Sequence, residues 1–318
     1  MNVKRSIIID TDPSPDDAVA FLMALGSPEE IELLAITTVG GNVPLRYTTR
    51  NALMALELAG RQRDVPVYAG AEGPLVRSLA TAEYVHGATG FEGFPLPDPV
   101  TQAGSGFAAD RIVELVMSRP AGTVTLCCLA PLTNIALALA REPELASRLA
   151  GIVLMGGARS EGGNITPAAE YNIYVDPEAA KRVFDCGAPL VMIPLDCTHK
   201  ALTTRRRMER LRAVGLPHME AFYHLLVFNK RFDEESWSKD GGPLHDPTVT
   251  AYLLKPELFA GRQVNVEISC DALTRGMTVV DWNAVTDRPK NALVLTEIDA
   301  EGYFDLVIER LAAAARPR

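Results

Sequence analysis

The chain has 318 residues, 47% of them apolar and 22% charged, a balance typical of a globular protein with a large core. Its formal net charge of −9 argues against a polyanionic partner such as DNA. The apolar stretch in MNVKRSIIID is too short for a secretory signal, and runs such as GIVLMGGA are too short to span a membrane.

The cysteines indicate a reducing compartment. They are odd in number, form no CxxC pair and lie in apolar, strand-like contexts, so buried reduced thiols and a cytoplasmic location are expected. They are Cys127, Cys128, Cys186, Cys197 and Cys270.

The first two-thirds of the chain alternate short apolar runs with longer helical patterns. Strands are predicted at residues 5–10, 31–39, 65–70, 123–130, 151–157 and 189–196. Helices are predicted at residues 16–27, 45–60, 106–120, 131–143 and 176–187. This alternation predicts a Rossmann-like α/β fold, with a mostly parallel central sheet and helices on both faces.

The last third of the chain departs from this rhythm. Residues 203–236 carry consecutive helical patterns without a strand, and we interpret the region of about 203–240 as a helical lid or insertion. A helix is predicted at residues 245–259, followed by strands at residues 262–270, 276–282 and 292–299. The chain has no repeat, low-complexity run or flexible linker, so a single domain over residues 1–318 is expected.

Residues 7–17, IIIDTDPSPDD, crowd Asp10, Asp12, Asp16 and Asp17 where the first strand ends and the first helix begins. Carboxylates this close repel one another unless a metal ion, a helix N-terminus or solvent compensates them. One aspartate would suffice to cap the helix, and the others would be surplus. Oxygen ligands at this density suit Ca²⁺ or Mg²⁺ better than zinc. The pattern therefore favours a cation site.

Other polar side chains also stand where strands end or helices begin, which is where open α/β sheets bind ligands. They are Asn42 in ITTVGGN, His86 in HGATG, Glu170 and Asn172 in AEYNIYVDPEAA, and His245 and Asp246 in LHDPTV. Taken alone, Asp246 is best explained as the N-cap of a helix that begins at Pro247, and His245 as a capping or exposed imidazole. Their joint placement favours one shared site.

Taken in order, these motifs make the chain resemble the inosine-uridine nucleoside hydrolase family. The motifs are DTDPSPDDA, ITTVGGN, LAPLTNIA, VLMGG with AEYNIYVDPEAA, and LHDPTVTAYLL. The match runs in register from near residue 5 to beyond residue 282, and the DxDPxxDD opening is the family's hallmark. The resemblance implies a mostly parallel α/β fold, tightly bound Ca²⁺, and hydrolysis of the N-glycosidic bond of ribonucleosides.

The resemblance also implies a calcium site in this chain. Asp12, Asp17 and Asp246 would ligate the ion together with a backbone carbonyl, most simply that of Leu129. Asp12 would also act as the general base toward a metal-bound water, and Asp10 would support the metal site from its edge.

Around this ion, the resemblance implies a substrate site. The ribose hydroxyls would be held by Asp16, Asn42, Glu170 and Asn172, with Asn164 near the 5′ end and His245 near the leaving base as a proton donor. Apart from the resemblance, His86 and His224 are candidates for contacts with the base or sugar. Such a site fits the reaction, because the oxocarbenium-like transition state needs an activated water, negative charge beside the ring and help for the departing base.

The chain departs from the family pattern at Ser14-Pro15, since the family often has Gly at the first position, as in DPGxDD. A different backbone path through this turn is therefore expected. The lid does not align cleanly either, so the choice between purine and pyrimidine bases stays open. The candidates for base contacts there are Tyr223, His224, Phe228, Phe232 and Trp237, although core packing explains Tyr223, Phe228 and Phe232 equally well.

Two alternative functions are also consistent with parts of the sequence. The DxD opening also resembles the nucleophile loop of haloacid-dehalogenase-type phosphatases, but Pro13 and the following acids depart from that pattern. Alternatively, the chain is a calcium-dependent nucleoside-binding protein that has lost turnover. For the hydrolase, the expected partner is a small ribonucleoside, with no nucleic acid or membrane, and a homodimer or homotetramer is expected from the resemblance.

Overall fold

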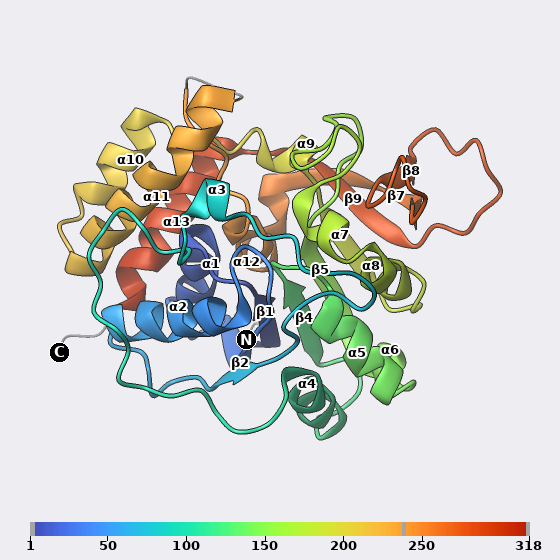
Figure 1. The fold of residues 1–318 in the computed structure, drawn as a ribbon, viewed down its shortest axis with the longest axis horizontal. Coiled ribbons are helices and arrows are strands. Elements are labelled where there is room, and N and C mark those ends of the chain that lie inside the picture. Colours follow the sequence, from blue (N-terminus) through green and yellow to red (C-terminus); the bar gives the residue numbers. More distant parts are fainter. Residues whose placement is uncertain (1–3, 237–239, 316–318) are drawn as a thin grey trace.

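All nine predicted strands form one mixed sheet, in the order β3-β2-β1-β4-β5-β6-β9-β7-β8 (Figure 1). The computed structural model describes residues 4–236 and 240–315, with residues 230–236 described by their backbone alone. The strands are β1 (Arg5–Thr11), β2 (Ile31–Thr38), β3 (Val67–Ala69), β4 (Val124–Cys128), β5 (Leu149–Met155), β6 (Leu190–Ile193), β7 (Phe259–Ile268), β8 (Thr278–Asp281) and β9 (Ala292–Ile298). Strands β1 to β6 and β9 are parallel, whereas β7 pairs antiparallel with β8 and β9. The predicted fold class is confirmed.

Helices cover both faces of this sheet (Figure 1). They are α1 (Pro15–Leu25), α2 (Leu45–Leu58), α3 (Glu83–His86), α4 (Ala108–Met117), α5 (Thr133–Arg141), α6 (Leu145–Arg148), α7 (Tyr171–Val175), α8 (Pro177–Phe184), α9 (Leu195–Thr198), α10 (Arg205–Arg212), α11 (Pro217–Ser236), α12 (Pro247–Leu254) and α13 (Ala300–Ala314), with a 3-10 turn at Pro256–Leu258. Helices α10 and α11 occupy the segment interpreted as a lid, and α13 is not among the predicted elements.

Alternating side chains of β1 divide the core between the two faces. Ile7 and Ile9 belong to a buried apolar cluster shared with α1, α2 and α13. Ile8, which points to the opposite face, belongs to a second cluster shared with α4, α5 and α8. A strand buried on both faces explains the uninterrupted apolar run that predicts β1.

The order of strands changes direction at β1. The chain continues from β1 to β2 and β3 on one side, and then crosses to β4, β5 and β6 on the other. At such a switch point the loops diverge and leave a crevice beyond the carboxyl ends of the strands. The N–H of Leu129, just after β4, donates to the carbonyl of Asp10 at 2.8 Å, which joins the two strand ends. The acidic loop therefore opens into this crevice.

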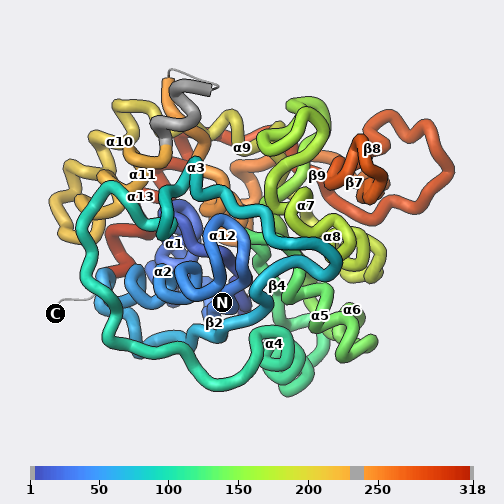
Figure 2. Tube along the Cα trace, in the orientation of Figure 1, coloured from blue at the N-terminus to red at the C-terminus, as the bar shows by residue number. Residues whose placement is uncertain are grey.

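The far edge of the sheet is built differently. Strands β7 and β8 form an antiparallel hairpin, and the loop that follows β8 projects from the side of the molecule (Figure 2). All five cysteines are free thiols, and Cys127, Cys128 and Cys197 are buried, as predicted, whereas Cys186 and Cys270 are only partly buried because they follow the ends of α8 and β7. In the described part of the chain, no helix has both the length and the hydrophobicity needed to cross a membrane.

Candidate active site

The acidic loop follows β1 directly and runs into α1. Pro15 is the first residue of this helix, where its fixed φ angle suits the helical conformation. Ser14 has φ −101° and ψ −178°, an extended conformation that any residue adopts, so the turn accommodates serine without strain. Asp16 and Asp17 consequently lie in the first turn of α1, where the helix dipole favours negative charge.

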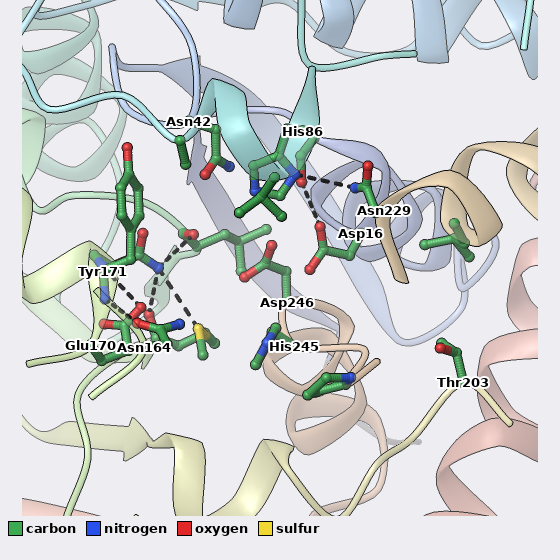
Figure 3. A pocket seen from close by; sticks show the side chains of 18 of the residues that line it. Asp16, Asn42, His86, Asn164, Glu170, Tyr171, Thr203, Asn229, His245 and Asp246 are labelled. Atoms are coloured by element: carbon green, nitrogen blue, oxygen red, sulfur yellow. Dashed lines mark hydrogen bonds between the residues drawn. The ribbon is translucent and has the colours of Figure 1, made fainter. Parts of the chain in front are cut away.

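Three carboxylates from distant parts of the chain converge beside this turn. Asp16, Asp17 and Asp246 each place an oxygen within 4.8 Å of the others, and Figure 3 shows Asp16 and Asp246 next to one another. Burial raises the pKa of Asp246 well above its ordinary value, and the charges of Asp16 and Asp17 raise it further. The cluster contains two predicted calcium ligands, together with the residue that the resemblance assigns to the ribose.

Asp17 is held by donors on both sides. Its Oδ1 accepts from the Thr11 hydroxyl at 2.5 Å, and its Oδ2 accepts from the Ser14 backbone N–H at 2.9 Å. Burial, followed by the charge of Asp16, raises the pKa of Asp17 to about 7. These hydrogen bonds therefore fix the orientation of the Asp17 carboxylate. Its hydrogen-bond partners among the described residues are neutral hydroxyl and N–H groups, and none is a positively charged side chain.

Asp12 lies deeper, against the loop after β2. Its Oδ2 accepts from the backbone N–H of Asn42 at 2.7 Å, and the Asn42 amide donates back to the Asp12 carbonyl at 3.2 Å. Gly41 makes this approach possible, because a Cβ there would stand 2.0 Å from Asp12 Oδ2. Asp12 Oδ1 is buried and has no hydrogen-bond partner among the described residues. Burial and the charge of Asp17 raise the pKa of Asp12.

Asp10 is anchored behind the crevice. Its Oδ1 accepts from the Thr37 hydroxyl at 2.6 Å and from the Asn134 amide at 2.8 Å. Its Oδ2 is buried and finds no donor within the described ranges, and burial raises the pKa of Asp10 to about 7. Asn134 also donates to the Thr38 carbonyl at 3.0 Å, so it ties the ends of β1 and β2 together.

The opposite wall of the crevice comes from the segment around α7. Glu170 caps this helix, accepting hydrogen bonds from three backbone N–H groups, and burial raises its pKa to about 7. The amide of Asn172 donates to the Leu129 carbonyl at 3.0 Å. Asn164 Oδ1 accepts from the Tyr171 backbone N–H at 2.9 Å, which fixes its loop against α7.

Two histidines flank the carboxylates, with His86 near Asp16 and His245 near Asp246 (Figure 3). His86 Nδ1 lies 3.2 Å from the Asn229 amide nitrogen, and His245 Nδ1 lies 2.8 Å from the Thr198 hydroxyl. Burial lowers the pKa of His245 to about 4, although the charge of Asp16 acts in the opposite direction. His245 is therefore neutral at pH 7.

A cavity of about 130 Å³ joins these groups. The predicted site residues that line it are Asp16, Asn42, His86, Leu129, Asn164, Glu170, Asn172, His245 and Asp246. Asp10, Asp12 and Asp17 lie outside this lining.

The structure separates the aromatic candidates from this cavity. Tyr223, His224 and Phe228 do not belong to its described lining. His224 instead stacks on Phe94, with 5.6 Å between the ring centroids. The side chain of Phe232 and the whole of Trp237 lie outside the described residues.

The donor set fits a hard divalent cation. Carboxylate oxygens of Asp16, Asp17 and Asp246 converge, and Asp12 presents a buried oxygen that lacks a partner among the described residues. The Leu129 carbonyl adds a neutral oxygen at the same crevice. Oxygen-rich sites of this kind suit Ca²⁺ or Mg²⁺, and a positive ion would offset the repulsion that raises the carboxylate pKa values.

Comparison with known proteins identifies the family. The family model for inosine-uridine preferring nucleoside hydrolases matches residues 7–305. The chain belongs to this family. It is similar to the pyrimidine-specific ribonucleoside hydrolase RihA of Salmonella typhimurium, with 46% identity over 96% of this chain and 97% of the relative.

Solved nucleoside hydrolase structures share the fold. A plant nucleoside hydrolase superposes with a TM-score of 0.90 at 35% identity, covering 98% of this chain and 99% of that one. A purine-preferring ribonucleoside hydrolase from Gardnerella vaginalis gives a TM-score of 0.90 at 31% identity, with 98% and 99% covered. As a member of this family, the protein is an N-glycosidase that acts on nucleosides.

Several residues of this nucleoside hydrolase site are not predicted from the sequence. Asn134, which donates a hydrogen bond to Asp10, lies within the LAPLTNIA motif. The motif marks this segment as part of the family pattern but does not reveal the role of Asn134. Asn229 and Thr203 line the cavity from the region interpreted as a lid, which contains none of the family motifs. Tyr171 also lines the cavity, although only its neighbours Glu170 and Asn172 were predicted.

Proposed function

We propose that the protein is a Ca²⁺-dependent ribonucleoside hydrolase that releases ribose and the free base. One observation carries the proposal: Asp16, Asp17 and Asp246 converge, and Asp16 and Asp246 line a cavity that Glu170 and Asn172 also line. Carboxylates on one wall and hydrogen-bonding groups on the other suit a cation and a polyhydroxylated ring between them.

In this proposal Ca²⁺ is held by Asp12, Asp17, Asp246 and the carbonyl of Leu129, with Asp10 in support. When bound, Ca²⁺ would orient the attacking water and the ribose hydroxyls and lower the pKa of that water. The support for this donor set is the buried, unpartnered Oδ1 of Asp12 and the convergence of Asp17 and Asp246. The ion would also allow these carboxylates to stay ionised at neutral pH.

Asp12 is proposed to accept the proton of the attacking water. Its Oδ2 is fixed by the Asn42 N–H, whereas its Oδ1 lacks a hydrogen-bond partner among the described residues and remains able to take a proton. Positive charge that develops on the ribose ring is stabilised by the neighbouring carboxylates.

The ribose is proposed to bind along the same cavity wall. Its hydroxyls would be held by Asp16, Asn42, Glu170 and Asn172, with Asn164 near the 5′ end. All of these side chains line the cavity. Glu170 is already fixed by three backbone N–H groups, so it would contact the sugar without reorganising.

At the other end of the cavity, His245 and His86 are proposed to face the base. His245 is neutral at pH 7 because burial lowers its pKa to about 4. A neutral imidazole still carries one N–H, which would donate a hydrogen bond or a proton to the departing base.

We propose a preference for pyrimidine ribonucleosides such as uridine and cytidine. The chain is 46% identical to a relative named as pyrimidine-specific, and 31% identical to a structure named as purine-preferring. Polar groups at the base end, including Asn229 and His86, would supply hydrogen bonds to the edge of the ring.

A nucleoside panel tests these proposals together. Uridine, cytidine, inosine and adenosine are incubated with the protein and Ca²⁺, and the released ribose is measured as reducing sugar. Ribose release, fastest from the pyrimidine nucleosides and abolished in Asp12→Ala, is expected. Binding without ribose release would favour the calcium-dependent binding protein. p-Nitrophenyl phosphate completes the panel, and a match to the nucleoside hydrolase family over residues 7–305 argues against phosphate release.

We also propose a cytoplasmic homodimer or homotetramer, built from single-domain protomers with a lid at about 203–240. The free, mostly buried cysteines support a reducing compartment, and the pair α10 and α11 supports a helical lid. Light scattering coupled to size-exclusion chromatography measures the assembly directly, and a monomer at micromolar concentration would overturn the oligomeric proposal.

A further inference from the structure

The hydroxyl of Ser14 lies between two carboxylates of the acidic loop. Its Oγ is 2.5 Å from Asp16 Oδ1 and 3.0 Å from Asp17 Oδ2. Ser14 is 1% exposed and also lines the cavity, whereas Asp16 is half-buried, so the contact between them is partly shielded from solvent. Hydrogen bonds to ionised acceptors in such surroundings are stronger than those between neutral groups.

The two carboxylates depend on this hydroxyl to different degrees. Asp17 has two further donors, the backbone N–H of Ser14 at 2.9 Å and the Thr11 hydroxyl at 2.5 Å. For Asp16, the Ser14 hydroxyl is the one hydroxyl or amide donor in the part of the chain that the structure describes, and the other hydrogen-bond partner of its side chain is the Asp246 carboxyl. Its shorter distance also favours Asp16 as the acceptor of the single hydroxyl proton.

The backbone allows this side chain at no conformational cost. Ser14 is extended and Pro15 begins α1, so neither residue demands the left-handed conformation that would favour glycine. Compared with glycine in the DPGxDD pattern, serine therefore adds one hydroxyl donor, and the backbone of the turn accommodates it without strain. Glycine at the same position would keep the backbone N–H that Asp17 accepts.

We infer that the Ser14 hydroxyl is a positioning group for Asp16, holding Oδ1 so that the rest of the carboxylate is directed at a ribose hydroxyl. The inference rests on the proposed function, because it takes Asp16 as a ribose contact. Asp17 is fixed mainly by Thr11 and the Ser14 N–H, so removing the Ser14 hydroxyl affects sugar binding more than cation binding.

Three variants separate these effects. Ser14→Gly removes the hydroxyl, keeps the N–H and disturbs the N-cap little. Ser14→Thr keeps a hydroxyl, and Thr11→Val removes a donor from Asp17 instead. For each variant, Ca²⁺ affinity is measured by calorimetry, ribose affinity by calorimetry at saturating Ca²⁺, and kcat and KM with uridine.

Ser14→Gly is expected to weaken ribose binding and raise KM by about tenfold, with Ca²⁺ affinity changed by less than about threefold. Ser14→Thr should restore ribose binding to within about threefold of the wild type, and Thr11→Val should weaken Ca²⁺ binding more than ribose binding. Unchanged ribose affinity in Ser14→Gly, or an equal loss of ribose and Ca²⁺ affinity, overturns the inference. A wild-type protein that binds ribose but releases none from uridine overturns the proposed function alone.

Discussion

Without the proposed Ca²⁺ ion, the stability of the protein should fall as the pH rises. Asp17 is fully buried, and burial with the charge of Asp16 raises its pKa from 3.8 to about 7. A carboxylate whose pKa is raised by folding contributes stability below the unfolded pKa, and this contribution is lost as the pH rises through the folded pKa. For Asp17 the loss falls between about pH 4 and pH 7.

The size of this loss follows from the pKa. Each pKa unit corresponds to 1.36 kcal/mol, so a rise from 3.8 to about 7 amounts to about 4 kcal/mol of unfolding free energy for Asp17 alone. A cation bound only by the folded protein restores about 4 kcal/mol at a concentration a thousandfold above its Kd. For a chain of this length, about 2 °C per kcal/mol converts this difference into a change in Tm of roughly 8 °C.

Thermal unfolding of dialysed protein with and without Ca²⁺, from pH 5 to pH 8, tests this reasoning. We expect Ca²⁺ to raise Tm by roughly 8 °C at pH 8 and by much less at pH 5, where protons compete for the carboxylates. Asp246→Asn serves as the matched control, since it relieves repulsion on Asp17 and removes a ligand, so Ca²⁺ should stabilise it little at either pH. Equal stabilisation of the wild type at both pH values, or none at pH 8, would refute the reasoning.

Three further predictions concern catalysis and are measured as ribose release. Asp12→Ala should lower kcat by about 10²- to 10⁴-fold because the proposed general base is lost, and full ribose release would contradict this role. Gly41→Ala should lower kcat by about 10²-fold, since its Cβ would stand 2.0 Å from Asp12 Oδ2 and displace the carboxylate. Gly73→Ala, whose Cβ would stand 3.4 Å from the nearest heavy atom, is the control and should retain activity. His245→Ala should slow the hydrolysis of uridine by about 10²-fold but the hydrolysis of p-nitrophenyl riboside much less, because p-nitrophenolate departs without a proton. Equal losses of activity on both substrates would exclude a proton-donor role for His245.

Much of the fold could be predicted from local patterns in the sequence. Strands such as Ile31–Thr38 and Ala292–Ile298 are buried apolar runs bounded by helices or turns, so their position follows from hydrophobicity alone. The starts of α8 and α12 follow from Asp-Pro pairs, because Pro suits the first position of a helix. Asp176 also caps α8 with its side chain, whereas Asp246 makes no capping hydrogen bond to α12 and instead joins the carboxylate cluster, so the N-cap explanation of Asp246 is wrong. The antiparallel pairing of β7 with β9 leaves no such local mark.

The site could be predicted only in part because its geometry depends on long-range contacts. The acids of the first loop were evident from their crowding, but Asn134 reaches Asp10 from a segment far along the chain. The prediction of a changed turn at Ser14-Pro15 could not foresee that the hydroxyl turns toward Asp16 and Asp17. Rotamers and partners of this kind are set by packing, which a single sequence does not display.

The place of β1 in the sheet also bears on how the protein is made. Strand β1 lies between β2 and β4 in the sheet, and Asp246 follows all three strands by a long stretch of chain. Because domains generally fold as units during synthesis, the nascent chain carries its acidic loop without the third carboxylate until late in translation. Binding of the proposed cation would therefore wait until α12 has been made, and a truncated chain that ends before α12 would lack the third carboxylate of the cluster.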